Sequence, residues 1–213
     1  MPVDIDLNLP TTSRFGWVVE GADHGPDPVF DRVLWRSRSF VVVPTKGSLV
    51  PGWCLIVPRR PMLSLVALTT EERAEIAEVR AELAGRLRGA STEVFEFEHG
   101  ANHAGSPTGC GVDQAHMHVV PLGFDLCIAI QAVERLHTIS EDPIDLWGNV
   151  GTREYVLVRR DRDMMTRGFF PRSPTSQFVR KVIASQLGQD ARWDYRVHTG
   201  RESALRTIEL LRA

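Results

Sequence analysis

The order of the apolar segments between residues 33 and 120 places the strongest limit on the fold of this chain. Five apolar or alternating segments predict strands, at residues 33–35, 40–43, 53–57, 93–98 and 115–120. Between the third and fourth of these, Thr69 and Glu72 form a capping box that opens a helical pattern, which ends near Gly89. A glycine-rich loop, residues 100–113, separates the last two strands. This order predicts an α+β domain in which a meandering antiparallel sheet of about five strands packs with helices.

The segments on either side of this region carry weaker signals. Residues 1–29 are rich in proline, glycine and aspartate and predict an irregular N-terminal arm. After residue 120 we expect a helix at residues 125–136, a loop at 138–153 and a strand at 155–158. Two more helices are expected at residues 175–187 and 199–211. No repeat or flexible linker interrupts this part. Residues 126–213 are therefore interpreted as a C-terminal α/β extension packed on a core of residues 30–125.

The composition argues against several classes of protein. A formal net charge of −2 and a pI of about 6.4 give no global basic field, which argues against nucleic acid as a partner. Cys54, Cys110 and Cys127 are widely spaced and odd in number, so they indicate neither a zinc knuckle nor a disulfide framework. The acidic first residues and the lack of a long apolar run predict a cytoplasmic protein without a membrane partner.

The strand predicted at residues 115–120 carries an unusual set of polar side chains. Alternate residues of a strand share a face, so Gln114, His116 and His118 are expected to project from one side. Ala115 and Met117 are expected to point the other way, into the core. Three polar side chains on one strand face indicate a functional site.

Imidazole suits attack on phosphorus. A neutral ring nitrogen is nucleophilic near neutral pH, and the phosphoramidate that it forms is labile enough to break again. A second histidine two positions along the strand can stabilise the phosphoryl oxygens. The upstream glycines, Gly109 and Gly111, would let backbone N–H groups approach a phosphate closely.

A metal site is the alternative interpretation of a His-x-His strand. Zinc needs a third or fourth ligand, for which His99, His103 and Cys110 are candidates. None of them has a diagnostic spacing, and the glycine-rich loop favours phosphate, so no metal is predicted. Cys110 could itself act as a nucleophile, but a small packing residue beside the phosphate is the preferred interpretation.

Two segments, in the right order and separation, resemble the signature of the histidine-triad (HIT) family. Residues 109–121 are similar to its His-φ-His-φ-His-φ-φ motif, which follows a glycine-rich loop. Residues 49–59 are similar to its Pro-Gly-His-x-Leu-x-x-Pro-Lys segment. The resemblance covers residues 30–125 and implies a HIT-like fold for that core.

The resemblance also implies roles for individual residues. His116 would be the nucleophile that forms a covalent nucleotidyl-histidine, and His118 would contact the reacting phosphate, which the loop backbone at Gly109 and Gly111 would hold. The chain departs from the family pattern at three positions. Gln114 replaces the first histidine of the triad, Trp53 replaces the histidine after Pro-Gly, and Cys110 replaces a common loop glutamine. These changes leave the preferred leaving group open.

The rest of the chain resembles a longer bacterial HIT-like subgroup and, more distantly, the C-terminal domains of CwfJ-type RNA-processing proteins. Residues 95–100, 176–180 and 193–196 carry this likeness. We hypothesise that Gln177 or Arg180 reaches the phosphate site from the start of its helix. The alternative is that this segment is an ordinary capping and packing helix.

The resemblance implies a nucleotide hydrolase or nucleotidyltransferase, similar to diadenosine polyphosphate hydrolases or phosphorylases. An adenine nucleotide is the expected substrate, no cofactor is required, and the chain would be a monomer or a homodimer. The alternative function is a catalytically weak nucleotide-binding or RNA-processing (CwfJ-like) module. The expected catalytic residues are His116 and His118. The expected phosphate-binding residues are Gln114, Gly109, Cys110, Gly111, Gln177 and Arg180.

Overall fold

The computed structural model describes residues 14–89 and 92–212. Its strands are β1 (Trp35–Arg36), β2 (Phe40–Pro44), β3 (Cys54–Pro58), β4 (Glu93–Gly100), β5 (Met117–Leu122), β6 (His137–Ser140), β7 (Tyr155–Arg160) and β8 (Thr166–Phe169). Its helices are α1 (Gly16–Val19), α2 (Thr70–Leu87), α3 (Leu126–Gln131), α4 (Phe178–Gln186) and α5 (Arg201–Arg212), with short 3-10 turns η1 (Leu65–Ala67) and η2 (Asp190–Arg192).

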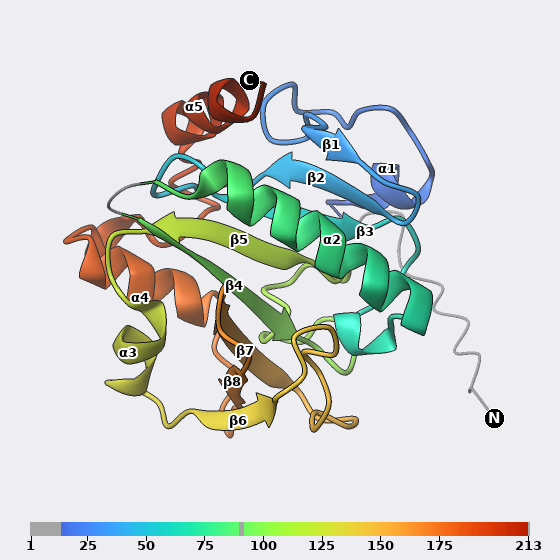
Figure 1. Cartoon of the computed structure of the whole chain (residues 1–213). Helices are drawn as coiled ribbons and strands as arrows, with labels where there is room; N and C mark the ends of the chain where they lie inside the picture. Colours follow the sequence, from blue (N-terminus) through green and yellow to red (C-terminus); the bar gives the residue numbers. More distant parts are fainter. Residues whose placement is uncertain (1–13, 90–91, 213) are drawn as a thin grey trace.

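All eight strands join one antiparallel sheet in the order β1-β2-β3-β5-β4-β7-β8-β6 (Figure 1). The predicted α+β class is therefore confirmed. The expected count of about five strands was too low, because β6, β7 and β8 extend the sheet beyond residue 125. The sheet is also not a strict meander, since β5 lies between β3 and β4.

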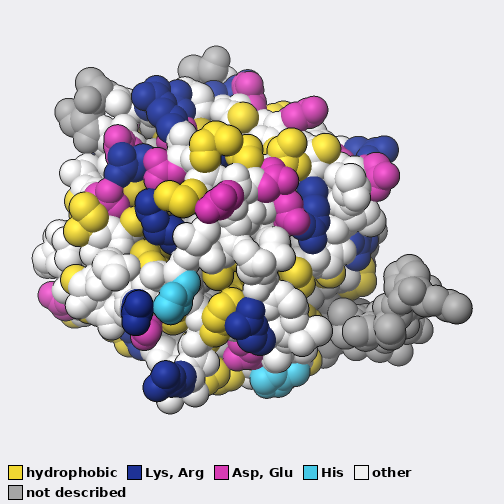
Figure 2. Space-filling view, turned by 60° about the horizontal axis from the view of Figure 1, so that its bottom comes forward, with side chains coloured by type: hydrophobic (Ala, Val, Ile, Leu, Met, Phe, Trp, Pro, Cys, Tyr) yellow, Lys and Arg dark blue, Asp and Glu magenta, His cyan; other side chains and the backbone are white. Residues whose placement is uncertain are grey.

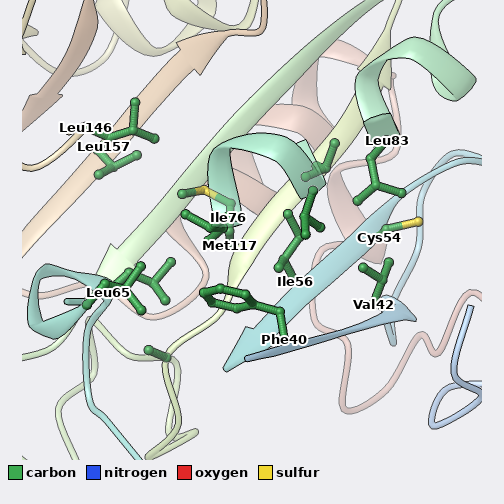
Figure 3. Packing of buried hydrophobic residues seen from close by; sticks show 14 of the residues in the cluster. Phe40, Val42, Cys54, Ile56, Leu65, Ile76, Leu83, Met117, Leu146 and Leu157 are labelled. Carbon is green, nitrogen blue, oxygen red and sulfur yellow. The ribbon is translucent and has the colours of Figure 1, made fainter. Parts of the chain in front are cut away.

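Helix α2 lies across one face of the sheet (Figure 1). Its predicted capping box is present: the Thr69 side chain accepts a hydrogen bond from the Glu72 amide, and the Glu72 carboxylate accepts one from the Thr69 amide. Ile76 and Leu83 on the buried side of the helix join Ile56 of the sheet in one apolar cluster (Figure 3). This packing fixes which residues of each strand face away from α2.

The opposite face of the sheet is covered by three separate parts of the chain. Helices α3 and α4 pack over β4, β5 and β7. Phe15 and Trp17, from the segment predicted as an irregular arm, pack against β2 and β3. Residues 1–13 of that predicted arm lie outside the described residues. The candidate site forms on this second face, between the N-terminal segment and α4.

The region after residue 125 departs from the sequence prediction in two ways. The segment expected to be a loop, residues 138–153, contains most of β6 and the buried side chains of Leu146 and Trp147. Strand β8 was missed because Arg167 and Gly168 break the apolar pattern that marks the other strands. The predicted helices are present as α3, α4 and α5, although α3 ends earlier than expected, at Gln131.

The surface carries mixed charge. Figure 2 shows basic and acidic side chains interspersed over one face of the molecule, which agrees with the formal net charge of −2. None of the described helices is both long enough and apolar enough to cross a membrane.

Candidate active site

The two histidines of the motif line a cavity on the sheet face opposite α2. Its empty volume, mouth included, is about 420 Å³. Side chains from the N-terminal segment, the sheet, the glycine-rich loop and the C-terminal region line it: Arg14, Phe15, Thr45, Lys46, Leu55, Phe97, His99, Cys110, Val112, His116, His118, Gln177, Arg180 and Tyr195.

His116 presents one free ring nitrogen. Its Nδ1 atom lies 2.9 Å from the carbonyl oxygen of Gln114. Because a carbonyl only accepts, Nδ1 must carry the proton, and the lone pair of the neutral ring is on Nε2. Burial lowers the pKa of His116 to about 4, so the ring is neutral and nucleophilic at neutral pH.

His118 is held in the opposite tautomer. The indole Nε1–H of Trp53 donates to Nδ1 of His118 at 3.1 Å. Burial also lowers the pKa of His118 well below its usual value, so the ring is neutral and its proton lies on Nε2. The ring stacks on Phe97, with centroids 4.3 Å apart, and its centroid lies 5.0 Å from that of His116. The two histidines therefore supply complementary groups, a lone pair and an N–H donor.

The side chain of Gln114 does not join the histidines. Strand β5 begins at Met117, so Gln114 precedes the strand and does not follow its alternation. Its buried amide donates to the carbonyl oxygens of Pro58 and Arg60, at 3.1 and 3.0 Å. Gln114 is absent from the cavity lining, in contrast to the expected common face, and its backbone carbonyl is the group that orients His116.

In the glycine-rich loop, Cys110 lines the cavity and neither neighbouring glycine does. Cys110 and Gly111 have consecutive positive φ angles of 60° and 70°. The Cys110 thiol accepts a hydrogen bond from the Gln177 amide at 3.1 Å, and burial raises its pKa, so it is a neutral thiol at neutral pH. Gly109 lies against Ala101, where an added Cβ would approach the Ala101 Cβ to 3.1 Å.

Both polar side chains expected from α4 reach the cavity. The buried guanidinium of Arg180 lies over the Trp53 ring at 4.4 Å and donates to the carbonyl of Gly47 and the hydroxyl of Thr45. No described carboxylate forms an ion pair with it. Burial lowers the pKa of Arg180 to about 10, which leaves it charged at neutral pH. The side-chain amide of Gln177, by contrast, donates to the Asp194 carboxylate and accepts from the backbone N–H of Tyr195.

Sequence reasoning missed several lining residues. Arg14 comes from the segment predicted as an arm and pairs with Asp31 at 3.6 Å. Tyr195 comes from the C-terminal region, and no spacing in the sequence linked either residue to the histidines. His99 was considered only as a metal ligand, although the period-two pattern of β4 places it on the same face as Phe97.

The cavity is electrostatically unbalanced. Among the residues that the structure describes, Arg14, Lys46 and Arg180 line it, and no aspartate or glutamate does. Arg180 is buried without a carboxylate counter-ion among the described residues, which is costly for a cation, so the arrangement favours an anionic ligand. Within residues 14–89 and 92–212, no group of three or more His, Cys, Asp or Glu side chains has a geometry that could hold a metal ion.

Comparisons with known proteins agree with the sequence motif. Residues 30–125 match the family model of the HIT domain. The galactose-1-phosphate uridylyltransferase of Hypocrea jecorina is 33% identical over 94 residues, and that of Neurospora crassa is 31% identical over 96 residues. Each alignment covers 43% of this chain and about a quarter of the relative, 25% and 24% respectively.

The solved structures that resemble this chain are more distant in sequence. A hypothetical protein from Leishmania major is 15% identical with a TM-score of 0.44, over 55% of this chain and 77% of that one. A HIT-like protein from Bartonella henselae is 15% identical with a TM-score of 0.38, over 55% and 85%. Yeast Ap4A phosphorylase Apa2 is 12% identical with a TM-score of 0.42, over 70% and 66%. Residues 30–125 are therefore similar to the HIT domain, and this chain spans about a quarter of the length of the uridylyltransferases that it matches.

Proposed function

We propose that this chain is a nucleotide hydrolase or nucleotidyltransferase of the HIT superfamily, with His116 as the nucleophile. The observation that carries the proposal is the bond from His116 Nδ1 to the Gln114 carbonyl, which leaves Nε2 unprotonated in a cationic cavity. The substrate is a nucleoside phosphate ester, anhydride or phosphoramidate. An adenine nucleotide is the first candidate, and the uridylyltransferase relatives make a uridine nucleotide the second.

The first step forms a bond between His116 and phosphorus. The Nε2 lone pair attacks the α-phosphorus, and the bond to the leaving group breaks, so that the leaving group departs with the bonding electron pair. The Nε2–H of His118 donates a hydrogen bond to a phosphoryl oxygen. The nucleotidylated ring of His116 is positively charged, and its Nδ1–H stays bonded to the Gln114 carbonyl, which stabilises that charge.

The second step reverses the first with a different acceptor. Water, phosphate or a hydroxyl group attacks the phosphorus, the N–P bond breaks with its electron pair returning to Nε2 of His116, and the proton that a water or hydroxyl acceptor loses passes to solvent. Comparing the products formed with and without added inorganic phosphate distinguishes hydrolysis from phosphorolysis. The reaction needs no metal in principle, since Arg14, Arg180 and the donors of the cavity can neutralise the phosphate.

Arg180 is proposed to bind the phosphate directly, because it is charged and buried and has no carboxylate partner in the described part of the chain. Gln177 is proposed to shape the site through its bonds to Asp194 and Tyr195. The backbone of residues 109–111 is proposed to contact the phosphate, since its consecutive positive φ angles expose the peptide groups beside Cys110.

The test is to trap the covalent intermediate. Wild-type protein is incubated with labelled diadenosine polyphosphates, adenosine phosphoramidate and uridine diphosphate sugars, and then quenched at alkaline pH, where the N–P bond survives. We expect a labelled protein adduct that disappears in His116→Ala and persists in His24→Ala, a matched change at an exposed histidine outside the cavity.

Two outcomes would contradict the proposal. An equal amount of adduct in His116→Ala would show that another residue is the nucleophile. Micromolar nucleotide binding without product from any substrate would favour the alternative of a catalytically weak nucleotide-binding module.

A further inference from the structure

We infer that His99 is a third imidazole of this site, and that its Nδ1–H donates to an oxygen of the bound phosphate. We infer further that the first turn of α4 selects the tautomer that makes this possible. The inference rests on the proposed function for the identity of the ligand. It goes beyond that function because it assigns His99 a role and connects the C-terminal region to the chemistry of the motif.

His99 lies beside the motif histidines. It is the penultimate residue of β4 and lines the cavity together with His116 and His118. Its ring centroid is 6.2 Å from that of His118, and the two rings are nearly perpendicular, at 88°. This position on the sheet provides the third polar side chain that the sequence led us to expect from Gln114.

The tautomer of His99 follows from its single hydrogen bond. The backbone amide of Val179, in the first turn of α4, donates to Nε2 of His99 at 3.3 Å. An amide N–H only donates, so Nε2 holds the lone pair. Burial lowers the pKa of His99 to about 3, and the neutral ring therefore carries its one proton on Nδ1.

That Nδ1–H has no acceptor. The Nδ1 atom is buried, and no described residue accepts a hydrogen bond from it. A buried donor without a partner costs free energy, so such groups are normally satisfied by a neighbour or by a ligand. The cavity lining offers two buried or half-buried guanidinium groups, Arg14 and Arg180, and no carboxylate. The acceptor for this N–H is therefore best supplied by an anionic ligand, and a phosphoryl oxygen can accept its hydrogen bond.

The alternative is that His99 only caps α4. Helix α4 has no side-chain cap of its own, so the bond from Val179 satisfies one of its free amide groups. The two roles use different ring atoms, because capping needs the acceptor Nε2 and ligand binding needs the donor Nδ1. Two substitutions separate them. Asparagine places its amide nitrogen where Nδ1 was, whereas glutamine reaches the position of Nε2.

The experiment compares His99→Asn and His99→Gln with wild type, using calorimetric binding of AMP and of inorganic phosphate together with thermal unfolding. We expect His99→Asn to bind both within about threefold of wild type and to unfold at a lower temperature, because α4 loses its cap. We expect His99→Gln to unfold near the wild-type temperature and to bind about tenfold more weakly, because a hydrogen bond to a charged group is lost.

The opposite order would overturn the inference, as would equal binding by both variants. Correlation spectra of the ¹⁵N-labelled histidines give an independent check. They should show the proton of His99 on Nδ1, and AMP or phosphate should shift that resonance. A proton on Nε2, or no shift with either probe, would also overturn the inference. None of these measurements requires turnover, so they hold even if the trapping experiment shows no His116 adduct.

Discussion

The polar groups on the two faces of strand β4 differ in whether they have hydrogen-bond partners within the protein. Glu96 and Glu98 point toward α2, while Phe97 and His99 point toward the cavity. These residues alternate along one strand; Glu96, Phe97 and Glu98 are buried, and His99 is half-buried. What differs is whether each polar group already has a partner.

On the α2 face both buried carboxyl groups of β4 have hydrogen-bond partners. The carboxylate of Glu96 accepts from Arg80 at 2.7 Å and from Arg159 at 3.1 Å. Glu98 accepts from the Leu65 amide, Trp147 Nε1 and the Tyr155 hydroxyl, each at 2.7 Å. Buried polar groups of this kind are tolerable only when their hydrogen bonds are made. The carboxyl groups on this face therefore need no ligand to satisfy their hydrogen bonds.

On the cavity face the matching is incomplete. His99 has an unpaired donor, and Arg180 has no carboxylate partner among the described residues. The contrast indicates that the α2 face has a structural role, whereas the cavity face is prepared for an anion. Substitutions on the two faces should therefore have opposite consequences for stability and for binding.

The largest effect on stability is expected from Arg80→Met. This change leaves the Glu96 carboxylate buried with one of its two arginine partners removed, and we expect a loss of about 3 kcal/mol in the free energy of unfolding. Urea denaturation measures it. Arg86→Met on the same helix removes an exposed pair with Glu82 and should cost less than about 0.5 kcal/mol. Equal losses in the two variants would contradict the account of the α2 face.

Arg180→Met should show the reverse pattern. We expect AMP or phosphate affinity to fall by about tenfold to a hundredfold, because a charge-assisted contact is lost. The free energy of unfolding without ligand should change by less than about 1 kcal/mol, since removal of an unpaired buried charge offsets the lost bonds to Gly47 and Thr45. Lys181→Met, one position along and outside the cavity lining, is the matched control. Unchanged affinity in Arg180→Met would refute its role in phosphate binding.

Acidification should also change the free energy of unfolding in opposite directions through the groups on the two faces. The pKa of His116 falls from 6.5 to about 4 on folding, so between these values the unfolded chain binds more protons and stability decreases as the pH falls. The pKa of Glu98 rises from 4.5 to about 7, so over that range the folded chain binds more protons and stability increases as the pH falls. Each contribution is about 3 kcal/mol.

Two variants separate these contributions. Measured by urea unfolding at several pH values between 4.5 and 7, without phosphate, His116→Asn should lose less stability on acidification than wild type. Glu98→Gln should lose more. If both variants keep the wild-type slope, burial does not shift these two groups in the manner described.

The sequence contained enough information to predict the α+β class, helix α2 with its capping box, and the pairing of His116 with His118. These features depend on local pattern, such as Thr69 with Glu72 or the His-x-His spacing where β5 begins. The side chain of Gln114 was misplaced because the strand begins three residues later, which no local pattern indicates. Arg14 and Tyr195 reach the site only through tertiary packing of segments that lie about 100 residues and about 80 residues from the histidines.

The central claim is that Nε2 of His116 forms the bond to phosphorus. The most direct measurement is peptide mass spectrometry, with ³¹P NMR, of wild-type protein quenched at alkaline pH during turnover of an adenine nucleotide substrate. The account predicts a nucleotidyl group on the peptide that contains His116, with phosphorus bonded to Nε2, because Nδ1 is held by the Gln114 carbonyl. A nucleotidyl group on Cys110 or on Nδ1, or turnover without any adduct, would contradict it.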